Sequence, residues 1–336
     1  MKALYLYCLM KSIQWGIIGC GDVTEVKSGP AFNKVPQSRL VAVMRRNEEK
    51  VRDYAQRHGV PQWYTRADDL INDPEVNAIY IATPPLYHEE YTVKALQAGK
   101  PVYVEKPMAL NAAAAARMAA VAQETGVKLC VAHYRREQPL FRKVKDMLEG
   151  GELGRVQLVQ LKMLQPHQSK IITQTEDNWR VNPAVSGGGL FHDLAPHQLD
   201  LVLHFFGRPS LANGIAVNQG GYYEPADTVS GQLLLPGGVL FQGLWSFVVP
   251  EGEKRDELTI IGDKGSLRFP VFDHHAITWT KEGGEEPILF DALEHVQQPM
   301  IEKVVQYFLG NTDNPCPAED GAEVMRLMEA FTRAAR

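Results

Sequence analysis

Two separated groups of residues in this chain of 336 residues have types and spacings suited to proton transfer. One is Lys106, which ends an apolar run and precedes a proline. The other is Asp193 with His197 four residues later, a spacing that puts both side chains on one face of a helix. A carboxylate can fix the tautomer of a neighbouring imidazole, and lysine and histidine are common general acids and bases. The pattern predicts acid–base catalysis.

Each group also has an ordinary structural interpretation. The motif at Lys106 could be a surface turn, and alone it does not outweigh that interpretation. Asp193 and His197 could cap and pack a helix, or they could be two metal ligands. Since no third Cys, His or acid with ligand spacing lies nearby, no metal site is predicted. Three glycines at 187–189 precede the pair and allow close packing.

A glycine motif, Gly19-Cys20-Gly21, follows the apolar run 13–18. The first glycine permits a tight turn, and the second lets the backbone approach a pyrophosphate at a helix N-terminus. Thr24 stands where the usual motif has its third glycine. An ordinary strand-to-helix turn is the alternative, but the strand–turn–helix context favours dinucleotide binding.

The end of the second expected strand indicates which dinucleotide is bound. NAD sites usually have an acidic residue there for the ribose hydroxyls. Here the strand ends in Arg45 and Arg46, whose guanidinium groups attract a 2′-phosphate. The two arginines could also be solvated surface residues. Their position favours NADP(H) over NAD(H).

The elements that position these residues follow from the apolar pattern. In the first third of the chain, apolar runs alternate with helical patterns, and Asn111 and Gly126 are expected to cap the last helix. Strands are predicted at residues 13–18, 40–44, 78–82, 102–105 and 128–132, with helices at 48–58, 88–98 and 111–125. This order predicts a doubly wound parallel sheet, which binds ligands at the carboxyl ends of its strands.

The remainder of the chain has the pattern of an α+β domain with a largely antiparallel open sheet. Strands are predicted near 156–164, 212–218, 228–235, 239–248, 257–261, 266–269 and 276–280, with helices near 139–148, 190–206, 300–309 and 321–335 and a mobile loop at 167–178. We predict an N-terminal extension at 1–11, a dinucleotide-binding domain at 12–132 and a substrate domain at 133–336. The first segment resembles the start of a signal peptide but lacks a small-residue cleavage site, so Met10 is expected to be the functional start.

The composition excludes several classes of protein. Hydrophobic residues make up 45 % and charged residues 22 %, as in ordinary globular proteins, and the net charge of −5 argues against non-specific nucleic-acid binding. Four scattered cysteines without a CxxC pair fit a reducing cytoplasm. No apolar run approaches the roughly 20 residues that cross a bilayer. We expect neither a nucleic-acid partner nor a membrane.

Taken together, the motifs resemble those of the Gfo/Idh/MocA oxidoreductases from about residue 13 to the C-terminus. The matching residues are Gly19-Cys20-Gly21, Ala82-Thr83-Pro84-Pro85 with His88, Glu105-Lys106-Pro107, and Gly187-Gly188-Gly189 followed by Asp193 and His197. The resemblance implies a Rossmann domain, a C-terminal domain with an open sheet, and NAD(P)-dependent hydride transfer. It implies that Lys106 is the catalytic lysine, that His197 transfers a proton or orients the substrate, and that Asp193 is a substrate or relay carboxylate.

The expected site residues fall into two further groups. Residues expected to bind the cofactor are Gly19, Gly21, Asp22, Val23, Arg45, Arg46, Ala82, Thr83, Pro84, His88, Glu105 and Lys106. Residues expected to contact the substrate are Tyr134, Arg135, Trp179 and Arg180.

The resulting hypothesis is an NADP-dependent enzyme acting on the hydroxyl or carbonyl carbon of a sugar, cyclitol or related polyol. It requires Lys106 and His197 to reach the same substrate. A non-catalytic NAD(P)-binding sensor and a diol dehydrogenase are the alternatives. The expected partner, besides the small substrate, is a second or further copy of the chain, in a homodimer or homotetramer formed through the second-domain sheet.

Overall fold

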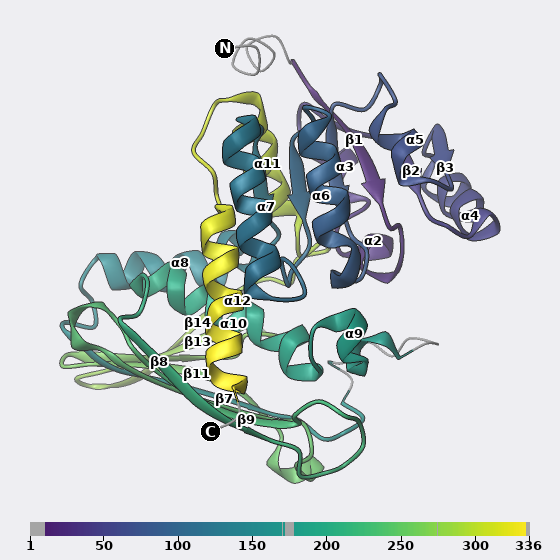
Figure 1. The fold of residues 1–336 in the computed structure, drawn as a ribbon. Helices are drawn as coiled ribbons and strands as arrows, with labels where there is room; N and C mark the ends of the chain where they lie inside the picture. Colours follow the sequence, from purple (N-terminus) through teal and green to yellow (C-terminus); the bar gives the residue numbers. More distant parts are fainter. Residues whose placement is uncertain (1–10, 170, 172–177, 274, 334–336) are drawn as a thin grey trace. The chain divides into compact units, whose positions relative to one another are not determined.

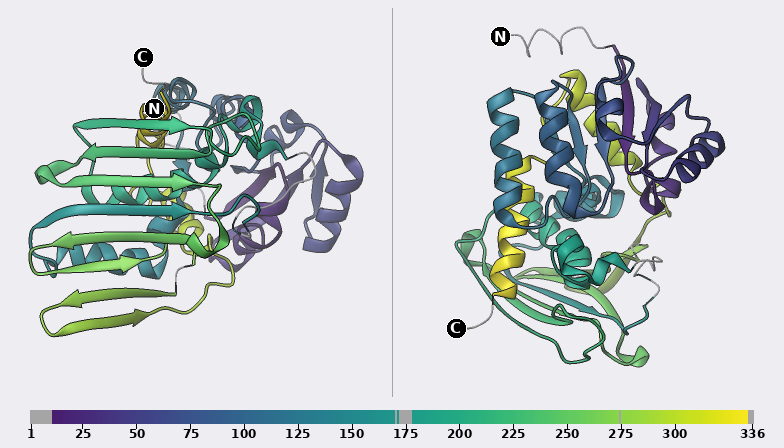
Figure 2. Two further views of the ribbon diagram at one scale, coloured as in Figure 1. Left: turned by 90° about the horizontal axis from the view of Figure 1, so that it is seen from below. Right: turned by 45° about the vertical axis from the view of Figure 1, so that its right-hand side comes forward.

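The computed structural model describes residues 11–169, 171, 178–273 and 275–333. The predicted extension therefore lies outside the described residues except for Lys11, and so does most of the predicted loop 167–178. The chain groups into two compact units, which are drawn in Figures 1 and 2. Unit 1 comprises Met1–Arg135 and Leu293–Ala322, and unit 2 comprises Arg136–Ala292 and Glu323–Arg336.

Unit 1 is built on a parallel sheet with strand order β3-β2-β1-β4-β5-β6. Its strands are β1 (Ile13–Ile18), β2 (Ser38–Met44), β3 (Gln62–Tyr64), β4 (Ala78–Ile81), β5 (Val102–Val104) and β6 (Leu129–Val131). The central strands β4 and β5 are wholly buried, which is why they read as continuous apolar runs. The order reverses between β1 and β4, the place where doubly wound sheets bind ligands. The predicted parallel sheet is confirmed.

The helices of unit 1 begin and end at residues suited to those positions. They are α2 (Asp22–Val26), α3 (Ala31–Lys34), α4 (Glu48–His58), α5 (Ala67–Ile71), α6 (His88–Gln97), α7 (Ala112–Thr125) and α11 (Gln298–Leu309). The Asn111 side chain accepts a hydrogen bond of 2.8 Å from the Ala114 N–H, and α7 ends at Gly126 in the left-handed region, with φ of 66°. Both predicted caps of this helix are confirmed.

The chain returns to unit 1 near its C-terminus. The sequence predicts that all of 133–336 belongs to the second domain, whereas Leu293–Ala322 groups with unit 1. Helix α11 packs on α3 and β1, and the ring of its Phe308 lies 5.5 Å from that of Trp15. The apolar face of this helix covers the first strand, a pairing between distant segments that periodicity cannot reveal.

Unit 2 contains an eight-stranded mixed sheet with order β14-β13-β12-β11-β7-β10-β9-β8. The strands are β7 (Val156–Leu164), β8 (Leu211–Val217), β9 (Thr228–Leu234), β10 (Leu240–Ser246), β11 (Arg255–Gly262), β12 (Gly265–Phe269), β13 (Ala276–Lys281) and β14 (Gly284–Leu289). Among the described pairs of this sheet, only β7–β10 is parallel, which confirms the largely antiparallel prediction. The left view of Figure 2 shows the strands as one broad layer.

Helix α10 (Leu190–Phe206) covers one face of this sheet. The indole N–H of Trp245 on β10 donates to the side-chain oxygen of Gln198 at 2.7 Å, and the Trp245 and Phe191 rings meet edge to face. Along β10, Phe241 and Trp245 are buried whereas Leu240 is exposed. The other helices with residues in unit 2 are α8 (Pro139–Glu149), α9 (Pro183–Ser186) and α12 (Ala318–Thr332), which begins in unit 1.

Candidate active site

The turn after β1 has the geometry that a dinucleotide-binding loop needs. Gly19 has φ of +95°, and a Cβ there would lie 2.7 Å from the Thr83 side chain, so glycine is required. A Cβ on Gly21 would lie 3.9 Å from its nearest neighbour, which leaves room for a phosphate beside the N-terminus of α2. The buried Thr83 hydroxyl, which follows β4, has no hydrogen-bond partner within the described part of the chain. These features fit a bound dinucleotide.

Thr24 replaces the third glycine of the motif without blocking the turn. Its buried hydroxyl donates to the Gly21 carbonyl at 2.8 Å and accepts from the Gly21 N–H at 2.9 Å. Beside it, burial raises the pKa of the Cys20 thiol to about 12. The turn is therefore closed by internal hydrogen bonds and carries a protonated, unreactive thiol.

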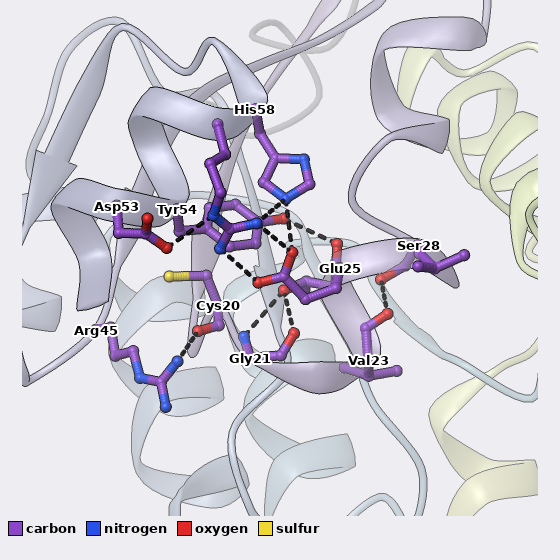
Figure 3. A network of polar contacts seen from close by, with 12 residues as sticks. Cys20, Gly21, Val23, Glu25, Ser28, Arg45, Asp53, Tyr54 and His58 are labelled. Atoms are coloured by element: carbon purple, nitrogen blue, oxygen red, sulfur yellow. Dashed lines mark hydrogen bonds and ion pairs between the residues drawn. The ribbon is translucent and has the colours of Figure 1, made fainter.

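A polar network fastens α2, which is only five residues long, to α4. The Arg57 guanidinium donates to both carboxylate oxygens of Glu25, at 2.8 and 2.9 Å, and to Asp53 at 2.7 Å. His58 lies 2.8 Å from the same Glu25 carboxylate, and the Tyr54 hydroxyl donates to the backbone carbonyl preceding Glu25 in α2. Figure 3 shows Glu25 and His58 facing each other beside Cys20 and Gly21. No pattern in the sequence predicts this network.

Removing the Glu25 charge is expected to destabilise the protein at neutral pH. Hydrogen bonds from Arg57 and then His58 lower the pKa of Glu25 from 4.5 to about 2. The carboxylate therefore stabilises the fold above pH 4.5, and this stabilisation is lost as the pH falls towards 2. Because about a third of the side chain is exposed, we expect Glu25→Gln to cost about 1 kcal/mol at pH 7.

Urea unfolding at pH 7 and pH 3 measures this effect. The difference in the free energy of unfolding between wild type and Glu25→Gln should be smaller at pH 3 than at pH 7. Glu302→Gln, which changes an exposed carboxylate on α11, serves as the control and should have the same free energy of unfolding as wild type at both pH values. An equal difference between wild type and Glu25→Gln at both pH values would contradict the role given to the Glu25 charge.

The two arginines after β2 lie at different parts of the same edge. Arg45 donates from Nη1 to the Cys20 carbonyl of the glycine turn at 3.1 Å. Arg46 donates to the Tyr87 hydroxyl at 3.0 Å, and its guanidinium lies 4.7 Å from the centre of the Tyr87 ring. Tyr87 follows β4 and was not predicted. Both guanidinium groups are thus held at the carboxyl end of the sheet.

His88 connects the loops that follow β4 and β5. Its side chain is fully buried, with Nε2 2.7 Å from the Thr83 carbonyl and Nδ1 3.0 Å from the Pro107 carbonyl. Burial lowers the pKa of His88. The imidazole therefore holds together two loops that carry predicted site residues, and its contact with a cofactor stays a prediction.

Lys106 follows β5, and its bond to Pro107 is cis. The preceding Glu105 is 5 % exposed, and its carboxylate accepts hydrogen bonds from the Tyr80 hydroxyl at 2.6 Å and the Gln297 side-chain amide at 2.6 Å. The backbone N–H of Lys106 donates to the second Glu105 oxygen at 3.0 Å. The catalytic candidate thus follows a buried, internally bonded carboxylate.

In unit 2, the first turn of α10 places Asp193 beside Arg180. The Arg180 Nε atom lies 3.3 Å from an Asp193 carboxylate oxygen, and the guanidinium lies 4.5 Å from the centre of the Trp179 ring. One turn further along, His197 is 4 % exposed and meets the Phe272 ring edge to face. The structure therefore joins three of the predicted residues through ion-pair and cation–π contacts.

A buried ion pair fixes the same helix further along. Asp200 accepts from the Arg136 guanidinium, with the shortest of these bonds at 2.6 Å, and both side chains are almost fully buried. Tyr134 and Arg135 are also buried, with the Arg135 guanidinium 5.5 Å from the Tyr134 ring centre, and belong to unit 1.

Lys106 and His197 belong to different units, so their action on one substrate stays a prediction. Within the described ranges, no group of three His, Cys, Asp or Glu residues could hold a metal ion. None of the described helices is long and apolar enough to cross a membrane.

Comparisons with known proteins define the class to which this fold belongs. Residues 13–133 match the model described as "Oxidoreductase family, NAD-binding Rossmann fold", and residues 141–268 match the "GFO/IDH/MocA C-terminal domain". The chain is thus an oxidoreductase with an NAD(P)-binding domain.

Individual relatives show to which family of oxidoreductases the chain is similar. The chain is 47 % identical to "Oxidoreductase P35" of Formosa agariphila, over 95 % of this chain and 98 % of the relative. It is 28 % identical to a 1,5-anhydro-D-fructose reductase of Ensifer adhaerens, over 76 % and 74 %. The crystal structure of an aldose-aldose oxidoreductase from Caulobacter crescentus, complexed with glycerol, has the same fold, with a TM-score of 0.85, 24 % identity and coverage of 97 % and 98 %. The protein belongs to the Gfo/Idh/MocA oxidoreductase family, and the predicted resemblance is confirmed.

Proposed function

We propose that this protein is an NADP-dependent oxidoreductase that transfers hydride between nicotinamide and a hydroxyl or carbonyl carbon of a sugar, cyclitol or related polyol. One observation carries the proposal: the carboxyl edge of a single parallel sheet brings together the glycine turn after β1, Arg45 and Arg46 after β2, Thr83 after β4 and Lys106 after β5. The names of two relatives, which refer to an anhydro sugar and to aldoses, support the substrate class.

Residues of unit 1 would hold the cofactor, which when bound accepts or supplies the hydride. Gly19, Gly21 and the N-terminus of α2, including Asp22 and Val23, would face the pyrophosphate. Arg45 and Arg46 would meet the 2′-phosphate. The other proposed cofactor contacts are Ala82, Thr83, Pro84, His88, Glu105 and Lys106.

The remaining residues would act on the substrate. Lys106 would take the hydroxyl proton during oxidation and return it during reduction. His197 would orient the substrate or relay the proton, with Asp193 as its carboxylate partner. Tyr134, Arg135, Trp179 and Arg180 would contact substrate hydroxyls or cover a sugar ring.

A substrate screen tests this function. Purified protein is assayed in both directions with NADP(H) and NAD(H) against sugars, inositols and aromatic trans-diols. Turnover of a sugar or cyclitol with NADP(H) is the expected result. Turnover restricted to diols would favour the diol dehydrogenase alternative, and cofactor binding without any turnover would favour a sensor.

The scattered cysteines favour the cytoplasm as the compartment.

We further infer that the open sheet of unit 2 joins copies of the chain into a homodimer or homotetramer. Large apolar side chains are exposed on three neighbouring strands, β8, β9 and β10. They are Leu211, Ile215, Val217, Leu234, Leu240 and Leu244. Contiguous exposed apolar residues of this kind mark interaction surfaces, and a second copy is the partner that is always present.

Replacing Ile215, which is 66 % exposed, with lysine is expected to dissociate the oligomer. A charge in the middle of an apolar interface would be desolvated without a partner. Sedimentation velocity measures the change in mass. Leu289→Lys on β14, at the opposite edge of the sheet, is the control and should keep the wild-type mass. A monomeric wild type would overturn the inference.

A further inference from the structure

A closed ring of hydrogen bonds in unit 1 links the catalytic lysine to the helix of the glycine turn. Its central member is Gln297, which lies 192 residues from Glu105 along the chain and is fully buried. The Gln297 side-chain N–H donates to Glu105 at 2.6 Å, and its side-chain oxygen accepts from the Tyr103 hydroxyl at 3.3 Å. Only this orientation of the amide satisfies both neighbours, since a carboxylate only accepts.

The ring closes at the end of α2. The backbone N–H of Gln297 donates to the Lys27 carbonyl at 3.2 Å, and Nδ1 of His295 lies 2.7 Å from the Val26 carbonyl. On the other side, the Tyr80 hydroxyl lies 2.6 Å from Glu105. The same hydroxyl is 3.2 Å from the Ser28 hydroxyl, and Ser28 adjoins Lys27. Two routes therefore join Glu105 to the residues that follow α2.

The ring supplies hydrogen bonds to the buried Glu105 carboxylate, which would destabilise the fold if it had no partner. Glu105 receives three hydrogen bonds, from Tyr80, Gln297 and the backbone N–H of Lys106. Burial and the Glu105 charge raise the pKa of Tyr80 well above 10, so its hydroxyl keeps its proton and donates. Removing one donor from a buried carboxylate forces it to reorient towards the donors that remain. The third donor is the catalytic residue's own backbone.

We propose that Gln297 is a positioning residue for Lys106, acting through Glu105. The inference deepens the proposed function and rests on the role given there to Lys106. Gln297 sets the direction of the Glu105 carboxylate, and that carboxylate holds the Lys106 backbone at the end of β5. The segment 295–297 directly precedes α11, which belongs to the same unit as β1 and α3.

Gln297→Met tests the proposal because it keeps the length of the side chain and removes its amide. We expect kcat to fall about 10- to 100-fold, the scale of a small misplacement of a catalytic group, while the Kd for NADPH changes by less than about threefold. Tyr103→Phe is the matched control, since it removes the hydrogen bond on the other side of the same amide and leaves Glu105 its donors. Its kcat should equal that of wild type.

A second measurement needs no substrate and so separates this proposal from the proposed function. Trace labelling with acetic anhydride, followed by mass spectrometry, compares the reactivity of Lys106 with that of exposed Lys303 in the folded protein across a range of pH. In Gln297→Met, but not in Tyr103→Phe, the Lys106 rate should change by about threefold or more relative to Lys303. If the wild-type protein shows no turnover but the Lys106 labelling rate still changes in Gln297→Met, the positioning role is supported and the proposed function is refuted.

Two results would overturn the proposal. One is an unchanged kcat and an unchanged Lys106 rate in a folded Gln297→Met protein. The other is an equal loss in Gln297→Met and Tyr103→Phe together with an equal fall in Tm, which indicates packing alone. If Gln297→Met does not fold, Tyr80→Phe removes the other side-chain donor to Glu105 and is expected to produce the same kinetic and labelling changes.

Discussion

Replacing Lys106 with alanine is expected to lower kcat by about 10²- to 10⁴-fold, the usual contribution of a general acid or base. The fold should be retained, because Tyr80 and Gln297 bond to the Glu105 carboxylate, which the variant keeps. The affinity for NADPH should change far less than kcat, since Lys106 is one of many proposed cofactor contacts. Steady-state kinetics and a fluorescence titration of the cofactor measure the two quantities separately.

Lys106→Arg separates proton transfer from charge. Arginine keeps the positive charge but does not release its proton in proteins. It should therefore be nearly as inactive as alanine. Lys303→Ala, on the exposed side of α11, is the control for loss of a lysine and should retain full activity. Near-normal turnover in Lys106→Ala would remove this residue from the mechanism.

Replacing Arg45 with aspartate is expected to weaken NADPH binding about 100-fold, since charge-assisted hydrogen bonds contribute about 1.5–3 kcal/mol each. The new carboxylate would also repel a 2′-phosphate. NADH lacks that phosphate, so its Kd should rise much less, through the lost bond from Arg45 to Cys20 alone. Titration with both cofactors gives the ratio of the two effects.

Arg52→Asp on α4 makes the same change of charge and serves as the control. Arg52 lies 5.9 Å from the Trp63 ring centre, and it is not among the proposed cofactor contacts. This variant should leave the preference between NADPH and NADH unaltered. If Arg45→Asp weakens both cofactors equally, the arginine maintains the turn and does not select the phosphate.

The sequence predicts the framework of unit 1 well, for a physical reason. Strands buried on both faces must be apolar throughout, so β1, β4 and β5 are visible as short apolar runs. The break between α2 and α3 was not predicted. It occurs where Gly29 packs against the Thr24 carbonyl and the Tyr54 hydroxyl, leaving no room for a side chain. Such a contact between distant residues has no periodic signal.

Some residues of the candidate site can likewise be predicted from the sequence, and others cannot. Residues on strand ends, such as Arg45 and Lys106, are found from motifs because the chain itself places them at the carboxyl edge. Tyr87, Arg57 and Gln297 were missed because each acts through a partner that is remote in sequence. In unit 2, the helical spacing of Asp193 and His197 was predicted, whereas the pairing of Asp193 with Arg180 is set by tertiary structure.

The return of the chain to unit 1 also affects the order in which the protein can be made. Ribosomes deliver the N-terminus first, and domains generally fold as they emerge. Here Leu293–Ala322, which carries Gln297 and Phe308, leaves the ribosome only after nearly all of unit 2. The nascent nucleotide-binding half must therefore wait with Trp15 lacking its Phe308 contact and Glu105 short of a donor, and a truncated transcript encoding residues 1–135 alone would yield an incomplete core.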